Sequence, residues 1–266
     1  MSRPGARRVD VASVLGLLAG VGLLGASQLL DGGSLASLWQ PTAAFIVFGG
    51  TAVATAISYP PIALRQTGTA LRRAFTTGPP PFEPLLGQFY FLAQRARQRG
   101  LLSLEAELER QPDPFLQTAL GLVVDGTDPD VCRQILEIES QTQRETEGRT
   151  AEVLETAAGY APTLGILGAV LGLIHVMERL SEPSSLGSGI AVAFVATVYG
   201  VGSANLLLLP LATKLRGLAR ESDTAREIVI EGAMALRDGL SPQLIDQKLR
   251  GFVVPMQGRR RRRAVA

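Results

Sequence analysis

The sequence is poor in charged residues. Only 19% of its 266 residues are Asp, Glu, Lys or Arg, whereas a soluble domain usually carries about 25%. The mean hydropathy is correspondingly positive, at +0.22. The charges also cluster along the chain and leave four long stretches that have none. This distribution argues against an ordinary soluble domain.

Cysteine and histidine are nearly absent, with one residue of each. The single Cys132 excludes a disulfide within the chain, and this composition also excludes a zinc cluster. Because Cys132 lies among Val131, Ile135 and Leu136, we expect a buried structural thiol. No catalytic histidine, cysteine or serine motif is present, so we predict that the chain is not an enzyme and binds no metal or cofactor.

Four long uncharged stretches are the main feature of the sequence. The first covers 11–30, and the apolar part of the second runs from about 41 to 59. The third lies between Glu155 and Glu178, and the apolar part of the fourth covers 190–211. Each can cross a hydrocarbon core of about 30 Å, which takes about 20 helical residues. We therefore predict four transmembrane helices. A cleaved signal peptide is the alternative for the first stretch, but its length argues against cleavage.

Basic residues predict the orientation of these helices. Of the 26, three precede the first helix, ten lie between Arg65 and Arg149, twelve follow the fourth helix, and only Arg179 falls between the third and fourth. By the positive-inside rule both termini and the long loop face the cytoplasm. The net charge of +2 gives no indication of nucleic-acid binding. The arginine run at 259–263 suits anionic lipid headgroups, but the favoured interpretation is a disordered tail that sets the orientation and has no specific ligand.

Proline and glycine divide the loop and tail into helices, and no alternating strand pattern of useful length occurs. We expect loop helices at about 85–99, 103–110 and 115–124, then a helix from Asp128 and Pro129 into the third span, and tail helices over 215–236 and from Ser241. The almost wholly polar stretch 139–152 predicts a solvated stalk. The fold class is all-α. Its four parts are spans one and two (1–60), a helical domain (61–155), spans three and four (156–213) and tail helices with a basic end (214–266).

The spans contain no acid or base at membrane depth. Only His175 comes near, at the outer end of the third span, where helix-end packing is favoured over a proton relay. A transporter that works alone usually keeps an ionisable or polar group near the midplane. If ions cross here, another chain must therefore supply the carboxylate.

Small residues recur at helical spacing in the third and fourth spans. The two sets are Ala161, Gly165, Ala169 and Gly172, and Gly189, Ala193, Thr197, Gly200 and Ala204. Such a face favours close packing within the subunit, with docking of another chain's helix as the alternative. Pro162 and Pro210 lie toward the cytoplasmic side and remove backbone donors, whereas Ala169 and Thr197 lie deeper, at comparable levels.

Several segments carry a family resemblance together. They are Gly49 through Pro60, Arg97 through Glu105, Ala161 through Gly172, Gly189 through Gly200, and the tail pieces Ile230–Gly232, Asp238–Pro242 and Lys248–Leu249. In this order and spacing they resemble the MotA-type stator subunit of the bacterial flagellar motor, which is related to TolQ and ExbB. The resemblance implies a protein of motility and chemotaxis in the inner membrane. It further implies a homo-oligomer, a pentameric ring around a MotB-like single-span partner whose aspartate binds the ion.

The resemblance also implies roles for individual residues. Arg97 and Glu105 would contact a FliG-like switch protein of the rotor, whereas spacing alone favours a salt bridge between them. Pro162 and Pro210 would couple ion passage to motion, and Thr197 matches the family threonine. Sodium-type members carry hydroxyls where this chain has Ala169 and Ala196, so the resemblance implies protons. The alternative function is a TolQ- or ExbB-like energiser of the cell envelope, but those proteins have three spans.

Overall fold

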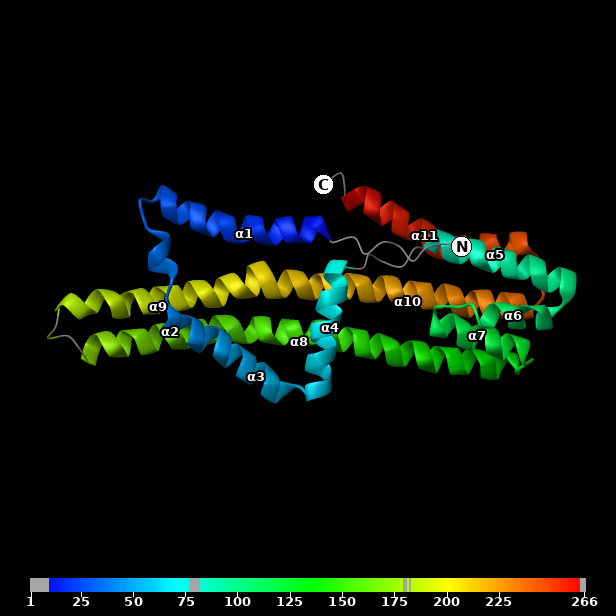
Figure 1. Ribbon diagram of the computed structural model, residues 1–266, viewed down its shortest axis with the longest axis horizontal. Helices are drawn as coiled ribbons and strands as arrows, with labels where there is room; N and C mark the ends of the chain where they lie inside the picture. Colours follow the sequence, from blue (N-terminus) through cyan, green and yellow to red (C-terminus); the bar gives the residue numbers. More distant parts are fainter. Residues whose placement is uncertain (1–9, 77–81, 179–180, 182, 264–266) are drawn as a thin grey trace. The chain divides into compact units, whose positions relative to one another are not determined.

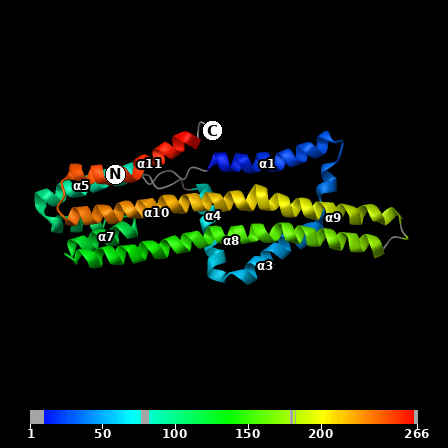
Figure 2. The same cartoon turned by 180° about the vertical axis from the view of Figure 1, so that it is seen from behind.

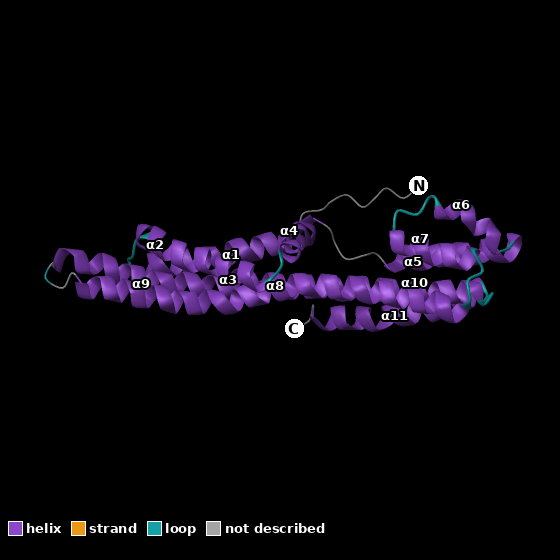
Figure 3. Cartoon of the chain, turned by 90° about the horizontal axis from the view of Figure 1, so that it is seen from below, coloured by secondary structure: helices purple, strands orange, loops and turns teal. Residues whose placement is uncertain are grey.

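A computed structural model describes residues 10–76, 82–178, 181 and 183–263. The prolines at 79–81 and the basic residues at 3, 7, 8 and 179 lie outside these ranges. Every regular element within them is helical, as Figure 3 shows, which confirms the all-α prediction. The elements are α1 (Val11–Leu30), η1 (Leu35–Leu38), α2 (Pro41–Ala44), η2 (Phe45–Gly49), α3 (Gly50–Ser58), α4 (Pro61–Thr76), α5 (Phe82–Arg99), η3 (Leu101–Leu104), α6 (Glu105–Leu108), α7 (Pro114–Val124), α8 (Pro129–Glu178), α9 (Pro183–Ser203), η4 (Ala204–Leu208), α10 (Leu209–Arg237) and α11 (Pro242–Arg263).

The chain divides into two compact units. The spanning unit comprises the described residues of 1–78 and 146–217, and the head unit comprises those of 79–145 and 218–266. Helices α8 and α10 contribute to both units. Each unit has its own set of packed side chains.

Four helical segments of the described chain are long and apolar enough to cross a membrane. They are Val11–Leu30, Leu35–Ser58, and parts of Pro129–Glu178 and Leu186–Arg237. This confirms the four predicted spans. The fourth span differs in one respect, because no break separates it from the predicted tail helix at 215–236. A π-helical turn, η4, precedes Pro210, and its wider register lets the helix continue past a residue that has no N–H.

Two helix starts in the head unit follow the predicted capping chemistry. The carboxylate of Asp128 accepts a hydrogen bond from the N–H of Asp130 at 3.0 Å, with Pro129 as the first helical residue of α8. The hydroxyl of Ser241 accepts from the N–H of Leu244 at 3.3 Å before α11. Both contacts satisfy amide groups that have no partner within the helix.

Helix α4 was not predicted. The Pro60–Pro61 pair reads as the end of the second span, and Tyr59 does take an extended conformation there. Pro61, however, is the first residue of a new helix, a position that tolerates proline because its amide would be unpaired anyway. In Figure 1, α4 runs across the direction of α8.

The predicted helix at 103–110 is also wrong in its bounds. After Gly100, which has a φ of +81° and ends α5, the chain forms the 3-10 turn η3 and then the short α6. Only Leu104 of η3 is buried, so the segment is held by one side chain rather than by a continuous helical face. Helix propensity alone therefore overestimates its length.

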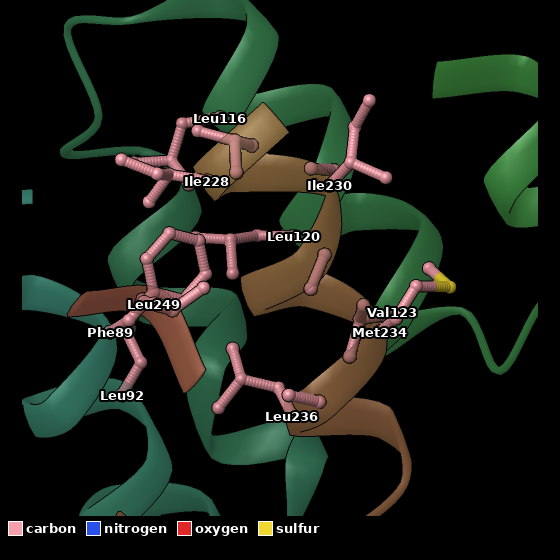
Figure 4. Close-up of a cluster of buried hydrophobic side chains, with 14 of the residues drawn as sticks. Phe89, Leu92, Leu116, Leu120, Val123, Ile228, Ile230, Met234, Leu236 and Leu249 are labelled. Atoms are coloured by element: carbon pink, nitrogen blue, oxygen red, sulfur yellow. The ribbon is translucent and has the colours of Figure 1, made fainter. Parts of the chain in front are cut away.

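The head unit has a large apolar core. Figure 4 shows side chains from α5, α7, α10 and α11 meeting in it, with Phe89, Leu120, Ile228 and Leu249 fully buried. Helix α11 lies beside α5 in Figures 1 and 2. Cys132 belongs to the same core, and its burial raises the pKa of the thiol. The prediction of a buried structural cysteine is confirmed.

The polar stretch 139–152 is not solvated on every side. In the head unit Ser140 is buried, and Arg144 forms an ion pair with Asp223 of α10 at 3.0 Å. In the spanning unit Thr150 is buried as well. Most of the remaining side chains are exposed, as predicted for a stalk, but one edge of the stretch is packed.

Candidate ion path and partner-binding surface

The small residues of α8 and α9 pack against one another. A methyl group at Gly200 would lie 2.5 Å from the carbonyl oxygen of Ala161, and one at Gly165 would lie 2.9 Å from that of Ala196. At Gly172 the added carbon would lie 2.9 Å from the amide nitrogen of Ala193. Helices α8 and α9 run side by side in Figures 1 and 3. Of the two readings that the sequence left open, packing within the subunit is therefore confirmed for these glycines.

The second span covers one side of this helix pair. Ala43 and Val47 pack on Val195 and Ala196, and a ring contact joins Phe48 to Tyr199 with centroids 5.5 Å apart. The hydroxyl of Tyr199 also donates to the carbonyl of Leu38. Residues 195, 196 and 199 of α9 thus face inward. Because Ala196 is fully buried, it cannot line an ion path.

The predicted path residues lie elsewhere on the same helices. Thr197 is exposed and Ala169 is half-buried. The Thr197 hydroxyl donates to the carbonyl of Ala193 at 3.4 Å, so its oxygen lone pairs remain available as acceptors. Next to it on α9, Phe194 and Val198 are 71% and 41% exposed. These residues form an exposed apolar surface that carries one hydroxyl.

The two prolines predicted to couple ion passage to motion occupy different environments. Pro162 lies inside the unbroken α8, half-buried, and its Cα would be 3.2 Å from a methyl group at Gly200. Pro210 is exposed and follows η4. Pro162 is therefore fixed against α9, whereas Pro210 sits beside a locally widened turn, the more deformable of the two positions.

An ionic cluster that the sequence did not predict ties α1 to α10. Lys214 forms an ion pair with Asp10, donates to the hydroxyl of Ser13 at 2.8 Å and lies 4.9 Å from the centre of the Phe75 ring. The amide of Asp10 donates to the carbonyl of Phe75 at 2.9 Å. Hydrogen bonding by Lys214, and secondly by Ser13, lowers the pKa of Asp10 to about 2. No sequence signal other than the isolated charges at the two span ends pointed to it.

In the head unit the expected salt bridge between Arg97 and Glu105 is replaced by another. Arg95, two residues before Arg97 in α5, forms an ion pair with Glu107 of α6. Arg97 and Glu105 are both exposed, and neither makes an ion pair with any residue in the described part of the chain. The salt bridge predicted from spacing therefore forms between the neighbouring residues Arg95 and Glu107 instead.

His175 lies at the end of α8, 48% exposed, with its ring nitrogen Nδ1 3.8 Å from the carboxylate of Glu178. This helix-end position agrees with the role favoured from the sequence. Within residues 10–76, 82–178, 181 and 183–263, no group of three or more His, Cys, Asp or Glu side chains is placed to hold a metal ion.

These features define a class of protein, a multi-pass membrane protein with four helical spans and a helical head unit. A model of the MotA/TolQ/ExbB proton channel family matches residues 107–228. Motility protein A of Bacillus subtilis is 34% identical over 242 residues, which cover 91% of this chain and 90% of that protein. The chain belongs to the MotA/TolQ/ExbB proton channel family.

Two solved structures share the fold over most of both chains. One, described as the structure of C. jejuni MotAB, is 26% identical, with a TM-score of 0.87 and coverage of 91% of this chain and 95% of the other. The flagellar MotAB stator complex from Bacillus subtilis is 34% identical, with a TM-score of 0.83 over the same shares.

Proposed function

We propose that this chain is the channel-forming stator subunit of a flagellar motor, which converts ion flow into torque together with a single-span, MotB-like partner. The match to two MotAB structures over 91% of the chain carries this proposal. The spans lack an acid of their own, so a partner aspartate is required on chemical grounds. The protein would lie in the inner membrane with both termini in the cytoplasm, and the boundaries at 60, 155 and 213 remain predictions.

The partner's helices would lie on the side of α8 and α9 that the second span leaves open. Thr197 and Ala169 border that side, and the neighbouring Phe194 and Val198 are exposed. A pentamer of this chain would surround the partner with five such surfaces. Their smooth apolar character suits rotation, because few directional contacts must break at each step.

Ion flow supplies the energy for each step. A charge that crosses the membrane gains about 2.3 kcal/mol per 100 mV. Neutralising the partner's aspartate would favour a rotary step of ring against partner, and Pro162 and Pro210 would let the inner helices respond. The ion would be a proton, because Ala169 offers no hydroxyl and Ala196 is buried beneath the second span. Few oxygens are then left to replace the hydration shell of sodium.

The head unit would contact a FliG-like rotor protein through Arg97 and Glu105. Both side chains are exposed, and their charges are not balanced by ion pairs in the part of the head unit that is described. Exposed, unpaired charges of opposite sign are suited to electrostatic recognition of a partner. The nearby Arg95, already paired with Glu107, is instead a structural residue.

Deletion of the gene in its host tests the proposal as a whole. Flagellar rotation should stop and return with the wild-type gene, while envelope integrity stays normal. A TolQ- or ExbB-like energiser would give the opposite pair of results, with rotation intact and the envelope weakened. Rotation that persists without the gene would contradict the stator function.

Charge reversal tests the rotor contact. Arg97→Glu should abolish or strongly reduce rotation while fluorescently tagged subunits still reach the membrane. Arg99→Glu is the matched control, since Arg99 is also exposed in the last turn of α5. Equal effects of the two reversals would point to general surface charge, and normal rotation with Arg97→Glu would exclude the assigned contact.

A further inference from the structure

A small pocket opens between α5 and the end of α10 in the head unit. Its volume is about 140 Å³, which suits a single side chain. Its lining is mostly apolar, with Leu101, Leu236 and Leu240 as the largest apolar side chains, and it includes two arginines, Arg97 and Arg237. Positive charge in an apolar recess is unusual, because the walls cannot solvate it.

Arg237 is the less expected of the two. Its side-chain nitrogen Nη1 is buried and has no hydrogen-bond partner among the described residues. Arg237 lies in the last turn of α10, where a positive charge interacts favourably with the helix dipole. The dipole stabilises the charge but provides no hydrogen-bond acceptor for the buried N–H. The structure thus holds a buried donor that awaits an acceptor.

The charged and titratable groups near Arg237 do not balance it. The Cys132 thiol lies close enough to feel the guanidinium, but burial keeps it protonated and neutral. Glu231, six residues earlier on α10, forms ion pairs with Arg133 at 2.9 Å and with Lys248 at 2.6 Å. Asp238 is exposed and forms no ion pair with the chain as described.

Arg97 of α5 also lines the pocket and is exposed, so the pocket has a second arginine on its solvent side. Two planar guanidinium groups favour a carboxylate or phosphate, which each can bind through paired hydrogen bonds. The leucine side chains favour a ligand that also has apolar groups, because a free hydrated anion gains no stabilisation from apolar contacts. An acidic side chain with apolar neighbours on a protein surface satisfies both parts of the lining.

We propose that this pocket receives an acidic side chain of the rotor protein, held by Arg237 inside and Arg97 on the solvent side, with apolar neighbours packed on Leu101 and Leu240. The inference rests on the proposed stator function and adds Arg237 as an anchor of the rotor contact. Arg97 would meet the acid first, and Arg237 would fix its position.

The test uses the complete complex of this chain with its single-span partner and the purified rotor switch protein from the same organism. Arg237→Gln should weaken the association by about tenfold or more, because a buried charged hydrogen bond is lost. Arg237→Lys, which keeps the charge but loses the paired geometry, should fall between Gln and wild type. Arg220→Gln, an exposed arginine of the same helix, is the control and should bind as wild type.

Folding and binding are separated by the melting temperature of the same complexes. Removing an unpaired buried charge should leave it unchanged or raise it, so weaker binding by a stable Arg237→Gln complex supports the proposal. In addition, Arg237→Glu should lose binding, and replacing one acidic residue of the rotor protein with lysine should restore it.

Two results would overturn the inference. One is wild-type rotor binding by Arg237→Gln. The other concerns millimolar inorganic phosphate. If phosphate raised the melting temperature of the wild-type complex but not that of Arg237→Gln, and left rotor binding unaffected, the pocket would bind a free anion rather than the rotor protein. In either case rotation would still depend on the gene and on Arg97, so the proposed function would stand. The proposed function itself would fail if rotation persisted after deletion of the gene.

Discussion

At the residue scale, charge pairing distinguishes the side chains that hold the fold together from those that stay exposed. Arg95 and Arg97 are two positions apart on α5, yet Arg95 pairs with Glu107 and Arg97 stays exposed. The spacing of Arg97 and Glu105 suggested a salt bridge that the fold gives to other residues. An exposed pair would have contributed little to stability in any case. The same logic applies to Lys214, which is held by Asp10 and Ser13 at the end of the spans.

The Asp10–Lys214 ion pair should stabilise the attachment of α1. We expect Asp10→Asn and Lys214→Met each to lower the melting temperature of the detergent-solubilised complex at neutral pH. The double variant should lose less than the sum of the two, because each single change already breaks the pair. Melting temperatures of the four proteins measure this coupling, and strictly additive losses would show that the pair does not stabilise the fold.

The same pair predicts a pH dependence. The pKa of Asp10 is lowered from 3.8 to about 2 in the folded state, so the carboxylate is more easily kept charged there than in the unfolded chain. Its contribution to stability is full above the unfolded value and is lost as the pH falls through the folded one. The difference in melting temperature between wild type and Asp10→Asn should therefore shrink between about pH 4 and pH 2. A difference as large at pH 2 as at pH 4 would contradict the assignment.

At the element scale, α8 and α9 hold the spanning unit together by close backbone contact. Helix α1, in contrast, has no buried residue, and its attachment depends on the Lys214 cluster and on its packing beside η4. Glycine is required by space at positions 165, 172 and 200, because a side chain there would meet backbone atoms of the facing helix that cannot move aside.

Gly200→Ala should destabilise the α8–α9 pair by about 1–3 kcal/mol, the usual range for overpacking. The added methyl would lie 2.5 Å from the carbonyl oxygen of Ala161. Gly187→Ala in the same helix is the matched control, because nothing lies within 4 Å of its added carbon. Thermal unfolding in detergent should separate the two, and equal melting temperatures would show that the helices part easily.

Gly232→Ala makes the corresponding test in the head unit. Its added carbon would lie 2.5 Å from the ring of Phe89, which is fully buried. We expect faster hydrogen exchange at the amides of α5 and α10 in the complete complex. Phe89→Leu in the same background should reverse part of the effect by making room. Exchange as slow as in wild type would mean that the core adapts at no cost.

At the scale of the whole molecule, apolar surface is the dominant feature. Leu23, Phe45 and Phe194 are each more than 70% exposed in the isolated chain. Such extensive apolar exposure is stable only against lipid or other chains. Lipid can cover such a surface, and so can other chains, which agrees with the proposed ring around a partner in the membrane.

The proposed ion is tested on the intact motor. Replacing sodium by potassium in the medium should leave the rotation speed unchanged, whereas a proton uncoupler should stop rotation. The physical reason is the scarcity of oxygen ligands at Ala169 and around Thr197. Rotation that stops in potassium but survives the uncoupler would show that sodium drives the motor. Swimming speed or the speed of tethered cells is a sufficient readout.

The sequence by itself determined the features that depend on local composition. Four spans, the capping residues Asp128 and Ser241, and the buried Cys132 follow from runs of neighbouring residues and their hydropathy. Helix α4 was missed because a proline pair can both end one helix and begin the next. The resemblance to stator subunits likewise came from ordered motifs, so the family was accessible before any fold was known.

Only the tertiary structure decided which distant side chains meet. It paired Arg95 with Glu107 and Lys214 with Asp10, turned the small residues of α8 and α9 toward one another, and buried Ala196 beneath the second span. It also brought Arg237 beside Arg97, more than a hundred residues apart in the chain. The physical reason is that periodicity fixes the face of a helix on which a residue lies, but not the element that comes to pack against that face.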